Sequence, residues 1–339
     1  MNYTFGILQA ILRALADGTP SKPGIIATRA SITRPTANIY LAKLVSEGKL
    51  IKEGSGAHVT YRIVDTKYLP ENTSNSKRAS HHFSYAQSTL LDEHFLKYDV
   101  DGQLLVGVEG FITWCEQRKL DPYTKYDNYA LCLKALTKMH TSCGVLDATN
   151  EFIKHVDSPA LDMIYYADQY KLNEFGRSKL AEMGFLGKQL QDLELLEQVI
   201  AQILRKLECV IKTSKVDALA FTPPTLKRKH QILDLLDTAL THIPLPRLRL
   251  VKDYPTKIAT PQKSLKKREE RVNNAKKSIY VYDPRVGEYA TVLLIDDFVG
   301  SGATLNETAK KLKKEGVKKV IGFAIVGNMD MSYDIINEM

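Results

Sequence analysis

Hydrophobic residues near the C-terminus form two continuous runs, which predict strands, and between them a helical repeat, which predicts a helix. Four consecutive apolar residues, Val292 to Ile295, form a run typical of a strand buried on both faces. A helical pattern runs from Leu305 to Glu315 and ends at Gly316. Another apolar run, Val320 to Val326, follows. A strand, a helix and a strand in this order predict a parallel α/β sheet.

The segment between the first of these strands and the helix carries candidate chemistry. Two acids, Asp296 and Asp297, come directly after the apolar run and suit hydroxyl groups such as the diol of a ribose. A Gly-rich turn then leads into the helix through Val299, Gly300, Ser301, Gly302, Ala303 and Thr304. Free N–H groups and the helix dipole at such a turn bind phosphate. The alternative is a structural turn whose glycines only shape the chain.

This stretch resembles the signature of type I phosphoribosyltransferases, which bind 5-phosphoribosyl 1-pyrophosphate (PRPP). The resemblance implies that Asp296 and Asp297 form the catalytic acid pair and hold the 2′ and 3′ hydroxyls. It also implies that Val299 to Thr304 wraps the 5′-phosphate, with hydroxyl donors from Ser301 and Thr304. Mg²⁺ would be held mainly by pyrophosphate and ribose oxygens, so no metal site made by protein ligands is expected.

An earlier strand is predicted at Val216–Phe221, with a loop from Thr222 to Thr225 and a helix from Gln231 to Thr241. By the same resemblance, cations after this loop contact pyrophosphate, and Lys227 and Arg228 are the candidates. The usual Arg-Gly pair of the family is replaced here by Arg228-Lys229.

A basic stretch precedes the predicted strand Ile279–Val281. It is similar to the ComF-like phosphoribosyltransferases through Thr260, Gln262, Leu265, Arg271 and Asn274. The resemblance implies a mobile loop that closes over pyrophosphate and excludes water, with Lys267 and Arg271 among its cations. The alternative is a solvated, charged helix.

Residues 1–66 show the pattern of a winged helix-turn-helix. Apolar residues recur at helical spacing at Phe5, Ile7, Leu8, Ile11, Leu12 and Leu15. A second helix is predicted from Arg34 to Glu47, with Ile39, Leu41, Leu44 and Val45 on one buried face. Lys49–Glu53 and Val59–Ile63 predict a β-hairpin wing.

As a nucleic-acid reader, the second helix would enter a major groove. The candidate contacts are Arg34, Thr36, Asn38 and Tyr40 near bases or phosphates, and Lys43, Lys49, Lys52 and His58 on the backbone. The alternative is a module for protein–protein contact or dimerisation.

The middle of the chain carries no recognisable motif. Residues 67–82 are polar, without periodicity, and predict a linker. Residues 83–203 predict a mostly helical region of unknown role, with helices at Val108–Trp114, Tyr126–Met139, Ala160–Tyr170 and Leu186–Lys206. Its tyrosines could stack on bases, although aromatic residues at helical spacing are more often core.

The composition narrows the class of protein. The net charge of +8 over 339 residues favours a polyanionic partner. No apolar run approaches the length that spans a bilayer, so no membrane contact is expected. The four cysteines, Cys115, Cys132, Cys143 and Cys209, lack metal or redox spacing, which favours reduced thiols and a cytoplasmic location.

The predicted architecture is therefore multidomain, α plus α/β. Its parts are a winged helix-turn-helix (1–66), a linker (67–82), a helical region (83–203) and a parallel-sheet, phosphoribosyltransferase-like domain (204–339). Three functions remain open. They are an active phosphoribosyltransferase, a transcription regulator that senses PRPP without turning it over, and an effector of an antiviral defence system of the retron or toxin type. Partners expected with these are DNA or structured RNA, and further copies of the chain or other proteins.

Overall fold

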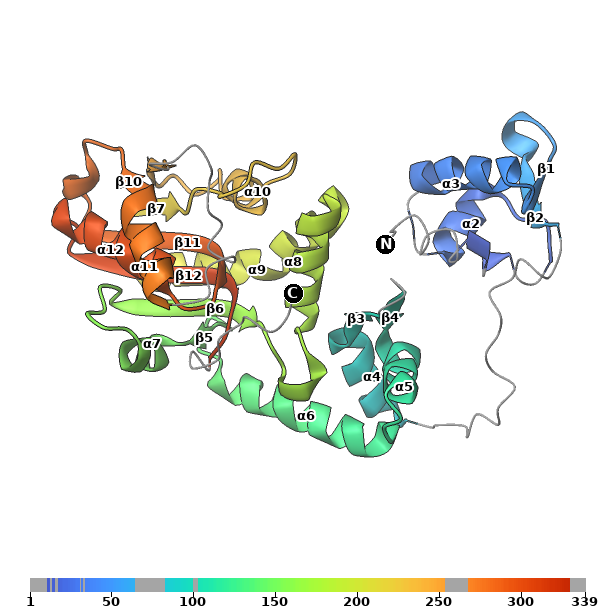
Figure 1. The fold of residues 1–339 in the computed structure, drawn as a ribbon, viewed down its shortest axis with the longest axis horizontal. Coiled ribbons are helices and arrows are strands. Elements are labelled where there is room, and N and C mark those ends of the chain that lie inside the picture. Colours follow the sequence, from blue (N-terminus) through green and yellow to red (C-terminus); the bar gives the residue numbers. More distant parts are fainter. Residues whose placement is uncertain are drawn as a thin grey trace. The chain divides into compact units, whose positions relative to one another are not determined.

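The computed structural model describes residues 11–12, 14–15, 18–30, 32, 34–64, 83–99, 103–253 and 268–329. The chain divides into two compact units, Met1–Pro122 and Tyr123–Met339, whose elements are labelled in Figure 1. No helix in these residues is both long and apolar enough to cross a membrane.

The first unit begins with two helices and a hairpin. Helices α2 (Pro23–Arg29) and α3 (Arg34–Ser46) precede strands β1 (Leu50–Glu53) and β2 (Thr60–Ile63), with the short 3-10 helix η1 (Gly56–His58) between the strands. The strands pair antiparallel, Leu50 opposite Ile63. The predicted helix at Arg34 and the predicted hairpin are confirmed. Of the predicted first helix, Ile11, Leu12 and Leu15 are buried, whereas Phe5, Ile7 and Leu8 lie outside the described residues.

The prediction that Ile39 lies on the buried face of α3 is wrong. Leu41 and Leu44 are fully buried, but Ile39 is 67 % exposed. Residues two positions apart on a helix point about 200° from each other, so Ile39 cannot share a face with Leu41. Ala37 completes the buried side instead.

Residues 83–122 form a second small arrangement in this unit. It contains α4 (Tyr85–His94), β3 (Leu96–Tyr98), β4 (Leu104–Val106) and α5 (Gly107–Gln117). Ser84 caps α4 in a reciprocal capping box with Gln87. Phe95 lies edge-on to Phe111, with ring centroids 5.1 Å apart, and Trp114 packs beside both. The predicted linker, residues 67–82, lies outside the described residues.

The second unit is built on a six-stranded sheet. Its order is β5 (Leu146–Asp147), β6 (Met163–Gln169), β12 (Lys319–Gly327), β11 (Thr291–Val299), β7 (Ala218–Phe221) and β8 (Arg247–Leu248). All neighbours run parallel except β5 and β6. Val292 to Ile295 are fully buried, which confirms a strand covered on both faces and the predicted parallel sheet.

Helices cover both faces of this sheet (Figure 1). The helices of the unit are α6 (Pro122–Met139), α7 (Thr149–His155), α8 (Lys179–Leu190), α9 (Leu193–Thr213), α10 (Ile232–Ala239), α11 (Arg268–Ser278) and α12 (Ala303–Lys314). Leu305 and Leu312 of α12 and Phe152 of α7 join the hydrophobic cluster of one face. Helix α9 packs on β6 between α8 and α10. Two 3-10 turns, η3 (Asn173–Phe175) and η5 (Val286–Glu288), and a ribbon of β9 (Leu250–Lys252) and β10 (Ile279–Val281) complete the unit.

Two helix predictions in the middle region are wrong. Ala160–Tyr170 contains strand β6, because Tyr165 and Tyr166 are favourable in strands and the segment finds two neighbouring strands. Leu186–Lys206 is two helices, because Gln191 adopts a left-handed conformation and Asp192 caps α9 through Leu195 N–H. The sheet therefore includes strands from the region 83–203 that was predicted to be mostly helical.

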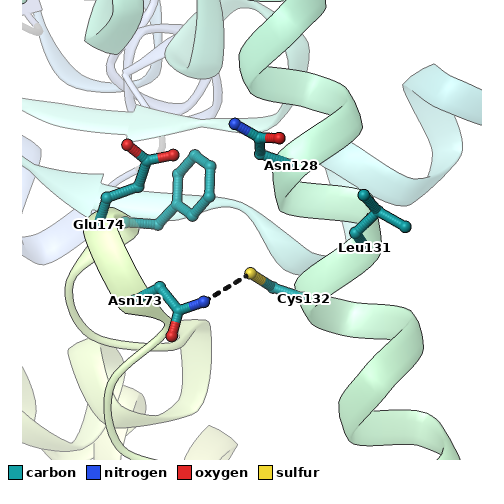
Figure 2. A pocket seen from close by; sticks show the side chains of 6 residues that line it. Asn128, Leu131, Cys132, Asn173 and Glu174 are labelled. Carbon is teal, nitrogen blue, oxygen red and sulfur yellow. Dashed lines mark hydrogen bonds between the residues drawn. The ribbon is translucent and has the colours of Figure 1, made fainter.

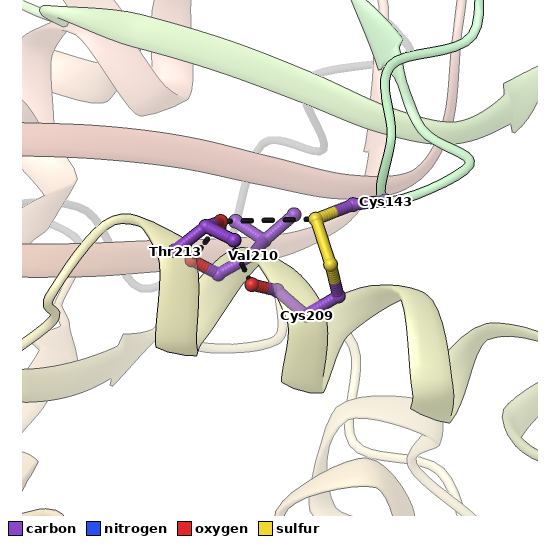
Figure 3. Close-up of a disulfide and its surroundings, with 4 residues drawn as sticks. All are labelled: Cys143, Cys209, Val210 and Thr213. Atoms are coloured by element: carbon purple, nitrogen blue, oxygen red, sulfur yellow. Dashed lines mark hydrogen bonds between the residues drawn. A yellow bond between two sulfur atoms is a disulfide. The ribbon is translucent and has the colours of Figure 1, made fainter.

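A disulfide joins the turn before β5 to α9. Cys143 and Cys209 are bonded, with their Cα atoms 5.5 Å apart, as Figure 3 shows. Thr213, one turn further along α9, donates its hydroxyl to the Cys209 carbonyl at 2.8 Å. The expectation of reduced thiols is wrong for these two residues, because a sequence separation of 66 gives no hint of a spatial pair. The cysteine content therefore no longer argues for a cytoplasmic location, although Cys115 and Cys132 are free thiols.

We expect reduction of this bond to lower the free energy of unfolding by about 2–4 kcal/mol, because the cross-link restricts a long loop of the unfolded chain. Urea unfolding with and without dithiothreitol measures the change. Cys143→Ser and Cys209→Ser should each lose as much as the double variant, since either one removes the whole bond. Cys132→Ser is the matched control. Equal midpoints with and without reductant would contradict the expectation.

Candidate functional site

The two acids lie where β11 extends past its neighbour. Strand β11 pairs with β12 as far as Val299, but its pairing with β7 ends at Ile295. Asp296 and Asp297 are thus part of the strand rather than residues after it, which corrects their predicted position. On the β7 side they face the loop that follows Phe221 instead of a strand. The carboxyl ends of parallel strands are where ligands bind in open α/β sheets.

Asp296 is held by hydrogen bonds from two directions. The Thr222 hydroxyl donates to its Oδ1 at 2.8 Å, and the backbone N–H of Asp297 donates to the same atom at 2.8 Å. Thr222 N–H also donates to the Ile295 carbonyl at 2.9 Å, which fixes the loop against the strand. The carboxylate is therefore oriented by the chain before any ligand arrives.

The pKa of Asp296 is raised to about 7, mainly by burial and also by the neighbouring charge of Asp297. The hydrogen bonds from Thr222 and Asp297 N–H and the charge of Lys252 oppose this rise in pKa. An acid that titrates near neutral pH can take up a proton as well as accept hydrogen bonds.

Asp297 is paired with a cation from a distant part of the chain. Lys188 Nζ, near the end of α8, lies 2.8 Å from Asp297 Oδ2. Both side chains are largely buried, with 16 % of Lys188 and 32 % of Asp297 exposed. Gln191, just after α8, donates to the Lys188 carbonyl and accepts from His230 N–H. One helix end therefore fixes both the second acid and the loop after β7.

The Gly-rich turn closes directly onto a helix N-terminus. Gly302 caps α12 with φ of 72°, a left-handed conformation that glycine adopts without strain. Ala303 is the first helical residue, so the free N–H groups of Ala303, Thr304 and Leu305 point out of the helix start. Asn306 in the first turn accepts from Ala160 N–H at 2.8 Å, which anchors the helix to the segment before β6. The turn has the form that binds a phosphate group.

An aromatic pair borders the acids. Phe298, the residue after Asp297, packs on Tyr170 with ring centroids 4.6 Å apart. The Arg177 side chain donates to the Tyr170 hydroxyl at 3.0 Å and lies 3.9 Å from the Phe185 ring centroid. This cluster ties the end of β11 to the segments after β6.

Only some of the predicted pyrophosphate contacts are among the described residues. Lys227 is exposed and Arg228 half-buried in the segment after β7, five and six residues after Thr222. Lys252 of β9 donates to Thr225 Oγ1 at 2.6 Å in that loop. Lys267 and the side chain of Arg271 lie outside the described residues, as do Thr260, Gln262 and Leu265.

The predicted nucleic-acid contacts fall into two groups. Exposed ones are Arg34, Asn38, Lys43, Lys52 and His58, whereas Thr36, Tyr40 and Lys49 are partly buried. Lys49 pairs with Glu47 at 2.7 Å, and Tyr40 packs against the hydrophobic cluster under α3. The exposed group lies on α3 and along the hairpin.

A small pocket in the second unit lies apart from these groups. It is lined by Asn128, Leu131, Cys132, Asn173, Glu174 and Phe175, as Figure 2 shows, and contains none of the predicted site residues. Asn173 Nδ2 donates to Cys132 Sγ at 3.3 Å, and burial raises the pKa of this thiol. A raised pKa leaves less of the thiol in the reactive thiolate form.

Three residues of the candidate site, Lys188, Lys252 and Thr222, are absent from the residues predicted from the sequence. Lys188 is 109 positions from Asp297 and sits in an ordinary amphipathic helix, so nothing marks it. Lys252 likewise has no motif around it. Thr222 did carry a signal, since it is a hydroxyl residue at the end of a predicted strand. Among the described residues, no group of three or more His, Cys, Asp or Glu side chains is placed to hold a metal ion.

Comparison with known families agrees with this geometry over part of the chain. Residues 249–334 match the family model of the phosphoribosyl transferase domain. The match includes β9 to β12, the acids, the Gly-rich turn and α12, which is about a quarter of the chain. No curated protein matches the chain. The matched domain supports a phosphoribosyltransferase type of enzyme.

Neutralising Asp296 should stabilise the protein at alkaline pH. The pKa of Asp296 is higher in the folded protein, so the folded protein holds this proton more tightly than the unfolded chain does. Proton binding therefore contributes to the free energy of unfolding below the ordinary pKa of an aspartate, and this contribution is lost as pH rises through about 7. We expect Asp296→Asn to raise the free energy of unfolding at pH 8 by roughly 1–3 kcal/mol and to have little effect near pH 4. Urea unfolding at the two pH values measures this.

Glu315→Gln, which changes an exposed acid at the end of α12 to the amide, is the matched control and should give no gain in stability that depends on pH. A gain for Asp296→Asn that is the same at both pH values would show that the charge is not responsible.

Proposed function

We propose that the protein is a phosphoribosyltransferase that binds PRPP at the end of β11 and transfers its phosphoribosyl group with release of pyrophosphate. The observation that carries the proposal is the juxtaposition of an oriented acid pair with the start of α12. Asp296 and Asp297 would hold the ribose diol, and the turn from Val299 to Thr304 would hold the 5′-phosphate. The family match over residues 249–334 supports the same substrate.

The side chains in the site would act by position and charge. The bond between C1 of the ribose and pyrophosphate breaks as the acceptor attacks C1, and positive charge develops on the ring in the transition state. Asp296 and Asp297 would fix the ring through its hydroxyls, and their negative charge favours that transition state. Lys227 and Arg228, in the segment after β7, would stabilise negative charge on the leaving pyrophosphate. Asp296, with its pKa near 7, can also take the proton that the acceptor loses.

Magnesium would bind together with the substrate. The donor set fits an ion that takes most of its ligands from pyrophosphate, ribose and water, with Asp296 or Asp297 as the protein carboxylates nearest to it. When bound, the ion would neutralise charge on the pyrophosphate. Lys188 holds Asp297 in the absence of a ligand and keeps its carboxylate from swinging away from the ribose position.

The alternative is a regulator that binds PRPP without turning it over. Both functions need the acids and the phosphate turn, so the static site supports both. Lys227 and Arg228 after β7 favour turnover, because cations in that loop can stabilise the leaving pyrophosphate.

We further propose that the first unit is a winged helix-turn-helix that binds DNA or structured RNA. The supporting observation is the exposed set on α3 and the hairpin, in which Arg34, Asn38 and Lys43 lie on the second helix. Exposed Ile39 lies among them and could contact a thymine methyl group or the sugar backbone. Within this scheme, the chain could be the effector of an antiviral defence system of the retron or toxin type, in which nucleic acid bound to the winged helix restrains the enzyme.

Phosphorus NMR of PRPP and Mg²⁺ with the purified protein and a small-molecule cell extract tests the enzyme. We expect pyrophosphate to form, and Asp296→Asn with Asp297→Asn to abolish its formation because the ribose loses both carboxylates. Glu315→Gln, at the far end of α12, is the matched acid-to-amide control and should keep full activity. PRPP that binds but stays intact would favour the regulator, and unchanged turnover in the double variant would refute the site.

Titration of duplex DNA and hairpin RNA at several salt concentrations tests the winged helix. We expect Arg34→Ala with Lys43→Ala to weaken binding and to reduce the slope of log affinity against log salt by about 2, one unit for each lost phosphate contact. Lys134→Ala with Lys138→Ala removes two exposed lysines from α6 and should leave the slope unchanged. Identical slopes in both double variants would assign α3 to protein contact instead.

A further inference from the structure

The ribbon of β9 and β10 has one face that the proposed function does not use. In an antiparallel pair, residues opposite each other share a face. Tyr280 lies opposite Val251, and the N–H of Tyr282 donates to the Arg249 carbonyl at 2.8 Å, so these four side chains share one face. The alternate residues face the other way: Ile279 is buried, and Val281 and Leu250 pack against the hydrophobic cluster of the sheet.

The two tyrosine rings on this face are open to solvent. Tyr280 is 49 % exposed and Tyr282 is 66 % exposed. Neither ring is needed for the core, because the inward face of the ribbon already supplies the buried residues. The Tyr280 hydroxyl donates to the Lys277 carbonyl at 2.9 Å, which holds that ring in place. Two aromatic rings two residues apart on a strand lie on the order of 7 Å from each other along the ribbon.

Each ring has a cation beside it. The Arg249 guanidinium carbon lies 5.1 Å from the Tyr282 ring centroid, and Lys311 Nζ lies 4.9 Å from the Tyr280 ring centroid. Lys311 Nζ is fixed by donating to the backbone carbonyls of Lys276 and Ile279. Lys276 and Lys277 are exposed at the end of α11, directly before the ribbon. Two carboxylates flank the ribbon: Asp253 follows β9 and donates its N–H to the Ser278 carbonyl, and Asp283 follows Tyr282 with its side chain largely buried, 3.6 Å from Arg285.

We propose that this face binds an unpaired stretch of nucleic acid. We name it the ribbon face and define it by Arg249, Lys276, Lys277, Tyr280 and Tyr282. Bases would stack on the two tyrosine rings, and the cations would contact the phosphates between them. Interleaved exposed rings and fixed cations complement both parts of a nucleotide, whereas a protein partner would need a larger apolar area. Unpaired strands are favoured over duplex because only unstacked bases can lie on an aromatic ring.

This surface is distinct from the two sites already proposed. It lies on the ribbon and the end of α11, not on the acids, the Gly-rich turn or α3. It does not depend on PRPP turnover, so failure of one proposal leaves the other standing.

Fluorescence anisotropy with a labelled oligothymidylate of about 20 nucleotides tests the ribbon face in the full chain. Arg34→Ala with Lys43→Ala serves as the background, so that α3 contributes little. In this background we expect Tyr280→Ala with Tyr282→Ala to weaken binding about 10-fold or more. Tyr282→Phe should bind like its parent, because stacking uses the ring and not the hydroxyl. Tyr85→Ala, which removes an 89 % exposed tyrosine from α4, is the matched control.

An abasic strand of the same length keeps the phosphates but has no bases to stack. We expect the parent to bind this strand weakly, with about the affinity that the double tyrosine variant has for the thymidine strand. The proposal is overturned if Tyr280→Ala with Tyr282→Ala binds within about twofold of the parent, if the abasic strand binds the parent as well as the thymidine strand does, or if no binding occurs. A loss of oligomer mass in the tyrosine variants, with binding unchanged, would make the ribbon face a contact between copies of the chain.

Discussion

The unequal ends of two neighbouring strands determine where this molecule can do chemistry. Strand β7 stops at Phe221 while β11 continues to Val299, so the last residues of β11 have a strand on one side and a loop on the other. That loop can place the Thr222 hydroxyl on Asp296 because it no longer has to follow the sheet. If β7 were longer, its ladder would occupy the space in which the acids meet the loop. The contact between Asp296 and Thr222 depends on this difference in length.

The electrostatics of the site follow from the same geometry. Successive strand residues point to opposite faces, so Asp296 and Asp297 enter different surroundings although they are adjacent. Asp297 meets Lys188 of α8 and forms an ion pair with it. Asp296 meets a hydroxyl and a backbone N–H, which orient the carboxylate without cancelling its charge. Two chemically identical residues therefore become one fixed anion and one group that titrates near neutral pH.

Local signals allowed prediction of the elements around the site, and long-range contacts limited it. The apolar run Val292–Ile295, the glycines after the acids and Gly316 at the helix end each act within a few residues, so they could be interpreted from the sequence. The order of strands in the sheet could not, because β6 joins through pairing with β12, more than 150 residues later. Tyr165 and Tyr166 favour a strand only weakly, and pairing with β12 decides the conformation of this segment. The Cys143–Cys209 bond and the Lys188–Asp297 pair were invisible for the same reason.

The position of β12 has a consequence for how the second unit is made. It is the last strand along the described chain, yet it lies at the centre of the sheet between β6 and β11. During synthesis, β6 has only the two-residue pairing with β5 as a strand partner until β12 leaves the ribosome, although helices α7, α8 and α9 also pack on it. Strands β7 and β11 can pair earlier, so the sheet grows as two separate halves. The two halves become one continuous sheet only when β12 pairs with both β6 and β11, and the edge that carries Asp296 and Asp297 is completed with it.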